Sequence, residues 1–245
     1  MNKKIYLLAL LIAAMLLALT GCIRIGGGNS VRGTGSMVTR EMDVPGNFTT
    51  LEVGGNFRVV YRQASEFSIT VVMQENLFEF LEISTTEEDT LLIDSSRNFV
   101  TTSNNRPRIY IYAPYLEVVS FYGDIDAEDW DVIAGEHFVI NGAGEANVSL
   151  EIEVGELEID LTGTGNLMLF GNADVANITI IGEVNVLANY LQVNHASIDL
   201  IGEGMIDLAV SEHLNVGLIG AGRVNYTGNP TVVHSALGEG RVEQR

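Results

Sequence analysis

The sequence predicts an all-β protein whose chain winds in turns of about 20 residues, stacked as a right-handed parallel β-helix or β-solenoid. Three observations predict this fold. Short glycine-containing segments recur at nearly constant spacing, apolar residues alternate on both sides of each glycine, and the chain has 26 Gly but only 4 Pro. That composition fits many strands separated by tight turns.

The repeat is visible in six segments that begin with INGAGEANV at Ile140 and end with ALGEGRVEQ at Ala236. We take one turn glycine in each segment as its reference position: Gly142, Gly163, Gly182, Gly202, Gly220 and Gly238. The spacings between these glycines are 21, 19, 20, 18 and 18 residues. Gly123, 19 residues before Gly142, is a candidate start of the series.

Apolar residues recur four and two positions before these glycines and four and six positions after them, as in Ile178, Ile180, Val186 and Ala188 around Gly182. The last segment departs from this pattern, with His234 four positions before Gly238. A period of two is strand alternation with one buried face. Equivalent positions should therefore stack as inward columns. A β-sandwich gives no reason for a fixed 20-residue pattern, and a leucine-rich repeat needs other offsets and a helical segment.

The part before the repeats is less regular. Alternating residues predict strands at 48–63, 67–74 and 89–96, and a strand pair at 106–123 broken at Pro114. Residues 75–85 are ambiguous between a strand and a short helical turn, and the polar residues 95–107 predict an exposed loop. We expect this part to continue the stack and to cap its amino-terminal end.

The first residues predict export. Lys3 and Lys4 precede an uncharged apolar stretch, Ile5–Leu19, which is typical of a signal peptide over residues 1–21. The following Leu-Thr-Gly-Cys resembles the lipobox of bacterial lipoproteins, which implies cleavage before Cys22 and a lipid on its sulfur. The alternatives are a plain signal peptide or an uncleaved anchor. Residues 22–42, rich in Gly and Ser, predict a flexible tether.

These features place the protein in the cell envelope, outside the cytoplasm. Since Ile23, and not Asp, follows Cys22, an outer membrane is the expected site in a cell with two membranes. The only Cys is Cys22, so no disulfide can form within the chain.

Charge limits the partners. Both lysines lie in the leader, so the mature chain carries 11 Arg against 32 Asp and Glu, a net charge of −21. Such a surface repels nucleic acid and anionic lipid headgroups and attracts cations or basic partners. An acidic surface can also serve only to keep the protein soluble and to block edge-to-edge strand pairing.

Four features follow one another from about Arg40 onward: REMDVPGNFTTLEVGGNFRVVYRQ, the passage RIYIYAPYLEVVSFYG, the repeated glycine turns and a closing YTGNP. In this order they resemble the family described as putative auto-transporter adhesin, head GIN domain. The resemblance implies one β-helical, envelope-exposed domain over residues 43–245. Family members usually carry Ser-Gly-Ser-Gly turns. Here Ile-Gly-Glu-Gly is common and Val184 replaces one second glycine, so turn-specific binding does not carry over.

Few residues predict chemistry. Asp124, Asp126 and Glu128 resemble the start of a calcium loop, but Asp129 and Gly135 stand where an EF-hand needs Gly and Glu, so an acidic solvent-facing turn is the alternative. We interpret the four histidines, at 137, 195, 213 and 234, as lying in different columns without a metal array. Glu145, Glu183, Glu203 and Glu239 recur near the turns, but not at one column throughout.

We therefore expect a non-enzymatic, lipid-anchored protein that presents a rigid acidic β-helix for adhesion, ligand binding or structural contact, without a cofactor. Its expected partners are the membrane, through Cys22, and a surface protein or glycan. The alternative is a β-helical polysaccharide lyase or hydrolase with carboxylates clustered across adjacent turns. A weaker third idea is a partner domain in envelope sensing.

Overall fold

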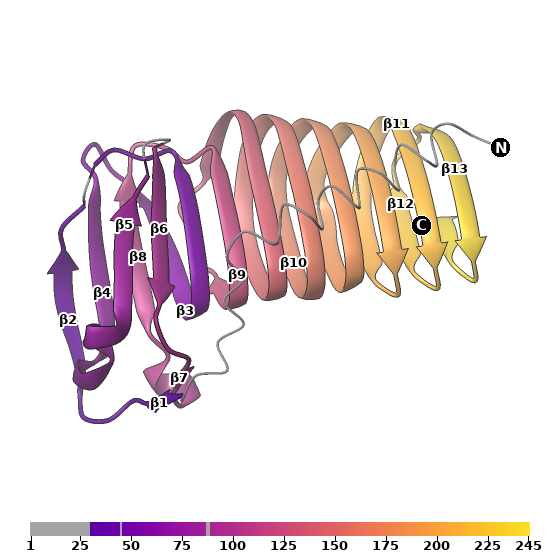
Figure 1. The fold of residues 1–245 in the computed structure, drawn as a ribbon. Helices are drawn as coiled ribbons and strands as arrows, with labels where there is room; N and C mark the ends of the chain where they lie inside the picture. Colours follow the sequence, from indigo (N-terminus) through magenta and orange to yellow (C-terminus); the bar gives the residue numbers. More distant parts are fainter. Residues whose placement is uncertain (1–29, 45, 87–88) are drawn as a thin grey trace.

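The structure, a computed structural model, describes residues 30–44, 46–86 and 89–245. It confirms an all-β protein (Figure 1). Among these residues, no helix has the length and apolar character needed to span a membrane. The elements are β1 Val31–Arg32, β2 Met37–Met42, β3 Thr50–Gln63, β4 Ser68–Gln74, η1 Glu75–Phe80, β5 Leu81–Thr85, β6 Thr90–Ser95, β7 Phe99–Val100, η2 Ser103–Asn105, β8 Arg108–Ala113, β9 Val118–Ala127, β10 Ile133–Gly202, β11 Met205–Gly220, β12 Arg223–Thr227, β13 Thr231–Gly238 and β14 Arg241–Gln244.

Strands β9 to β14 form a stack of parallel turns. β10 is extended without interruption and winds through several of these turns (Figure 1). β11 pairs in parallel with β10, and β13 and β12 pair in parallel with β11. The register follows the repeat, since Leu200 pairs with Leu218 and Leu218 pairs with Ala236.

Glycines form a column at one corner of the stack. Gly182 has a φ of +130°, and a side chain there would place its Cβ 2.1 Å from the carbonyl oxygen of Gly163. Only a residue without a Cβ fits this close approach and this backbone conformation. The column consists of Gly55, Gly123, Gly144, Gly163, Gly182, Gly202, Gly220 and Gly238.

The prediction that Gly142 is a member of this column is wrong. Gly144 pairs with Gly123, and a Cβ on Gly163 would meet the Gly144 carbonyl oxygen at 2.1 Å. Strand alternation has a period of two, so a shift of two residues leaves the buried and exposed faces unchanged. The apolar pattern could not detect this error.

The core of the stack consists of aliphatic columns. Ile180 is fully buried, and so are Ile198 and Leu200 on the next turn. At about 25 cal/mol per Å² of apolar surface, each such side chain contributes about 1.5–3 kcal/mol. The inward columns therefore hold the turns together, as the alternation predicted.

The amino-terminal region differs in topology. β3 pairs in parallel with β9, β8 and β6, so it continues the sheet of the stack. Beyond β8, the pairing becomes antiparallel: β4 runs antiparallel to β8, and β2 runs antiparallel to β4. The ambiguous residues 75–85 form the 3₁₀ helix η1 and then β5.

Two boundary predictions need correction. The flexible tether cannot extend to residue 42, because β2 pairs with β4 along its whole length. Residues 95–107 do not form a simple exposed loop either. Phe99 in β7 is 6% exposed and packs edge-on against Phe57, with ring centroids 6.0 Å apart. A single buried aromatic residue thus ties this polar segment to the core.

Candidate ligand-binding face

The structure brings His195 and His213 together on adjacent turns. The two residues pair in register, and their rings stack with centroids 5.2 Å apart and an interplanar angle of 15°. The prediction that the histidines occupy different columns is therefore wrong for this pair. Each of the two stands seven residues before its corner glycine, an equal spacing that the sequence already contained.

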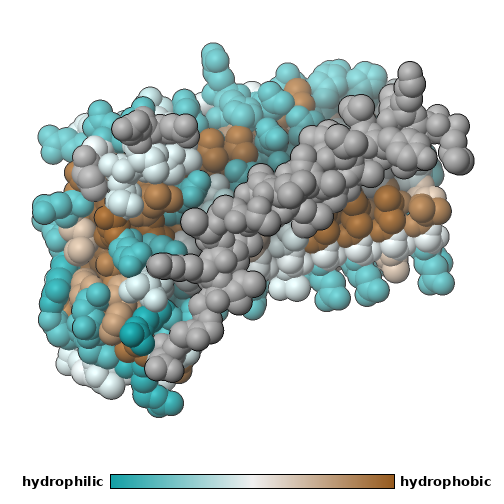
Figure 2. Space-filling view, in the orientation of Figure 1, coloured by the Kyte–Doolittle hydropathy of each residue, from teal (hydrophilic) through white to brown (hydrophobic). Residues whose placement is uncertain are grey.

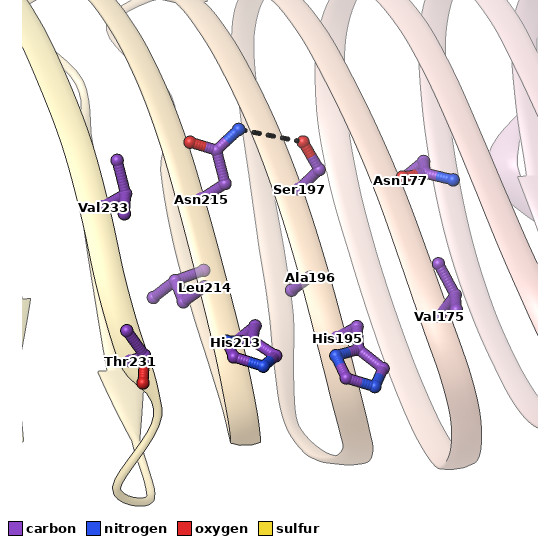
Figure 3. A pocket seen from close by; sticks show the side chains of 10 residues that line it. All are labelled: Val175, Asn177, His195, Ala196, Ser197, His213, Leu214, Asn215, Thr231 and Val233. Carbon is purple, nitrogen blue, oxygen red and sulfur yellow. Dashed lines mark hydrogen bonds between the residues drawn. The ribbon is translucent and has the colours of Figure 1, made fainter.

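A shallow depression of about 320 Å³ lies beside this pair (Figure 3). It crosses four turns and is lined by residues at five, six and seven positions before the corner glycines. Within it, the Asn215 amide donates a hydrogen bond to Ser197 Oγ at 3.5 Å. The lining residues are Val175, Asn177, His195, Ala196, Ser197, His213, Leu214, Asn215, Thr231 and Val233.

The depression lacks carboxylates although the chain is strongly acidic. Its outward positions carry imidazole, amide, hydroxyl and aliphatic groups. Two acids adjoin it from outside: the Asn177 amide donates to Glu156 Oε1 at 3.0 Å, and Glu212 Oε2 lies 3.5 Å from His195 Nε2. Asp199 follows on the same strand as His195, three residues before its corner glycine. Asp199 is exposed at the surface, and its partial desolvation raises its pKa above the usual value.

A column of aliphatic residues lies on the same strands, four residues after the last position that lines the depression. Ile201 pairs with Ile219, and Ile219 pairs with Leu237, each one residue before its corner glycine. Ile219 is 43% exposed and Leu237 is 71% exposed. Hydrophobic atoms recur from turn to turn along the side of the stack in Figure 2. We call the depression together with this column the candidate face.

In the acidic segment that was a weak calcium candidate, two of the carboxylates form ion pairs with arginine residues. Arg106 donates to Asp124 Oδ1 and to Asp126 Oδ2, both at 2.8 Å. Arg58 lies 3.7 Å from Asp126. Two guanidinium groups thus occupy the carboxylates that a calcium ion would need, whereas Glu128 remains exposed.

The turn glutamates do share a column once the register is corrected. Glu145, Glu183 and Glu203 each directly follow a corner glycine, and Glu239 does too. All four are exposed, and none lines the depression. These exposed carboxylates, interrupted in their column by Thr164 and Ala221, do not line a groove of the kind that a glycoside hydrolase needs.

Cys22 and the leader lie outside the described residues. The turn glycines other than Gly142 stand where they were predicted. The candidate face was missed because each outward residue looks ordinary by itself. Comparing equal distances from the corner glycines could have found it.

The fold and the exposed face define a class, namely all-β domains with stacked parallel turns that offer long side surfaces. The family model described as "Putative auto-transporter adhesin, head GIN domain" matches residues 47–230, and the chain belongs to this family. The description of the family is that of an adhesin and not of an enzyme, and it indicates a surface or extracellular location.

Solved structures share the fold. A putative adhesin from Bacteroides fragilis has a TM-score of 0.79 at 21% identity, covering 88% of this chain and 100% of that chain. A putative adhesin from Parabacteroides merdae has a TM-score of 0.64 at 20% identity, covering 89% and 100%. A putative lipid binding protein from Parabacteroides distasonis has a TM-score of 0.67 at 20% identity, with the same coverage. No protein of curated function matches the chain.

Proposed function

We propose that the protein is an exported lipoprotein, anchored by a lipid on Cys22, that presents a rigid right-handed parallel β-helix and binds an uncharged glycan of the envelope or of a neighbouring surface. Binding occurs on the candidate face and involves no catalysis. The family description, the leader sequence and the parallel register of successive turns support this proposal.

One observation supports an uncharged glycan as the class of ligand. In a mature chain of net charge −21, none of the residues that line the depression over four successive turns is acidic. The two adjoining acids, Glu156 and Glu212, contact Asn177 and His195 at its margin. Interface centres are depleted of charge, and amide and hydroxyl groups such as Asn215 and Ser197 can hydrogen-bond sugar hydroxyls. The exposed aliphatic residues Ile219 and Leu237 can contact the apolar faces of sugar rings.

The alternative of a carbohydrate-active enzyme receives less support. Its two carboxylates would have to converge in a groove. Asp124 and Asp126 instead pair with Arg106, and the corner glutamates are exposed outside the depression.

The test is a screen of residues 30–245 against glycans and envelope proteins, with turnover of the same glycans measured in parallel. We expect saturable glycan binding without released product. Released oligosaccharide would overturn the proposal that the protein is not an enzyme. Binding to envelope proteins alone would overturn the proposal that its ligand is a glycan.

The anchor has a separate test. Mass spectrometry of the protein from membranes should show a lipid-modified amino-terminal peptide that begins at Cys22. Cys22→Ser should release the protein from the membrane fraction. An unmodified Cys22 would contradict the lipid anchor and would favour export by a plain signal peptide.

A further inference from the structure

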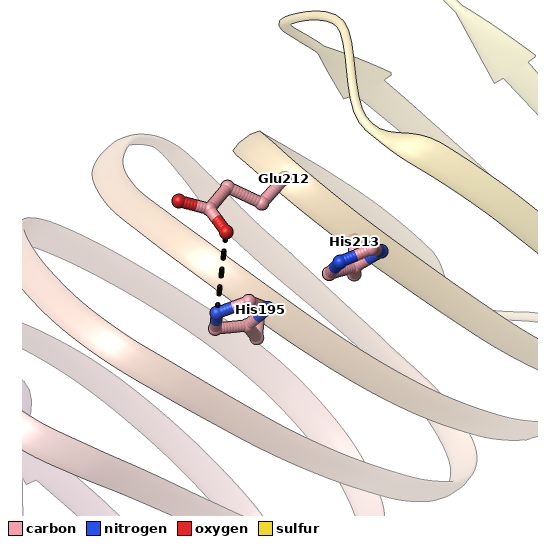
Figure 4. Close-up of side chains that lie close together, drawn as sticks. All are labelled: His195, Glu212 and His213. Carbon is pink, nitrogen blue, oxygen red and sulfur yellow. Dashed lines mark ion pairs between the residues drawn. The ribbon is translucent and has the colours of Figure 1, made fainter.

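We propose that His195, Glu212 and His213 form a site for a divalent transition-metal ion of the Zn²⁺ type, beside the depression (Figure 4). The proposed metal site shares His195 and His213 with the lining of the depression, but the argument for it does not rest on glycan binding. Each of the three residues offers one ligand atom, and these atoms lie within 4.8 Å of one another.

The donor set fits such an ion. Two imidazoles and one carboxylate with an open position are a common arrangement around Zn²⁺, whereas Ca²⁺ prefers six or more oxygen ligands. Around a tetrahedral Zn²⁺, ligand atoms lie about 3.3 Å apart, given metal–ligand distances of about 2.0–2.1 Å. His195 Nε2 already lies 3.5 Å from Glu212 Oε2. The other ligand atoms lie up to 4.8 Å apart, so the side chains must rotate to close the site, and Glu212 and His213 are exposed enough to do so.

The backbone places these residues on the outside by an irregularity. Val193 pairs with Val210 and His195 pairs with His213, so β11 has one residue more than β10 between these pairs. Such a β-bulge breaks the inward and outward alternation. As a result, three consecutive residues, Ser211 to His213, are exposed. In a regular strand, Glu212 would point to the side opposite His213.

Hydrogen bonds hold the bulge in place. Ser211 Oγ donates to Asn194 Oδ1 at 2.7 Å, and the Asn194 amide donates to Asp174 Oδ1 at 2.8 Å. This chain of side chains crosses three turns next to the histidines. It fixes the segment that carries Glu212, as outer contacts do at other metal sites.

The test is titration of the full chain, purified in detergent without a histidine tag, with ZnCl₂ and separately with CaCl₂. Calorimetry should show one Zn²⁺ per chain, and the ring resonances of His195 and His213 should shift in NMR spectra. CaCl₂ should cause neither change. Zn²⁺ should also raise the Tm, because the ion links two turns of the folded stack.

Variants assign the ligands. H195A and H213A should each weaken Zn²⁺ binding about 100-fold, and E212Q about tenfold. The matched controls are H234A, an exposed histidine in another column, and H137A, whose ring lies 3.7 Å from Glu158 without a second histidine. Neither control should change the affinity. No saturable binding by the parent chain, or equal affinity after H195A or H213A, would overturn the site.

Discussion

The stack and the amino-terminal region are held together in different ways. In the stack, residues 18–21 apart repeat the same contact, with aliphatic columns inside and a glycine column at the corner. In the amino-terminal region, each contact occurs once. Phe48 packs against Phe67, and Trp130 donates a hydrogen bond to the Val59 carbonyl at 2.7 Å. Periodicity in sequence therefore predicts the stack, whereas unique long-range contacts define the region before it.

The largest expected effect is a charge in an inward column. Ile180→Asp buries an unpaired carboxylate where the side chain is fully buried, which should cost about 4 kcal/mol or more and unfold several turns. The matched control is Ile181→Asp, since Ile181 points outward and is half-buried. Circular dichroism during urea unfolding should separate the two variants. Equal losses would contradict the assignment of inward and outward columns.

A smaller effect is expected at the corner. Gly182→Ala forces a Cβ against the Gly163 carbonyl oxygen at a φ of +130°, for an expected loss of about 2–4 kcal/mol. Gly135→Ala is the control, because its Cβ would meet its nearest atom, the His137 carbonyl oxygen, only at 4.0 Å. Thermal unfolding of both variants measures the difference. A tolerated Gly182→Ala would show that the corner does not depend on glycine.

The amino-terminal region offers a third comparison. Arg106→Ala removes both 2.8 Å bonds to Asp124 and Asp126 and should destabilise the protein by about 1–3 kcal/mol. Arg223→Ala, at an exposed position on the stack, should change stability by less than about 0.5 kcal/mol. Denaturant midpoints report both values. An unchanged midpoint in Arg106→Ala would mean that the cluster does not hold the region.

The smallest effect at neutral pH concerns Tyr61, which donates to the Ala113 carbonyl at 3.1 Å. Burial, together with the nearby Asp131 charge, raises the pKa of Tyr61 from 10.0 to about 12. Between pH 10 and 12, the unfolded chain loses this proton while the folded chain keeps it, so stability should fall as pH rises. Tyr61→Phe should lose about 1 kcal/mol at neutral pH and should not show this part of the alkaline decline. An identical decline in the variant would assign it to other groups.

The sequence predicted much of the fold for physical reasons. Alternation identified the buried columns, and regular spacing identified five of the six turn glycines correctly. It misplaced Gly142 because a shift of two residues preserves alternation. It also misjudged residues 95–107, since the burial of Phe99 depends on Phe57, far away in the chain.

The candidate face was harder to predict. His195 and His213 become neighbours only when the register is known, and Glu212 joins them through a one-residue bulge that no apolar pattern reveals. The partner of the acidic segment could not be predicted for a related reason. Asp124 and Asp126 are paired by Arg106, which reaches them from outside the repeat.

The central claim is that the carboxylate-poor candidate face binds the ligand. The most direct measurement compares glycan binding by the parent residues 30–245 and by Asn215→Glu, which places a charge in the depression. The matched variant Asn189→Glu carries the same change at an exposed position outside it. We predict at least a tenfold loss of affinity for Asn215→Glu, about 1.4 kcal/mol, and no change for Asn189→Glu. Undiminished binding by Asn215→Glu would contradict the account.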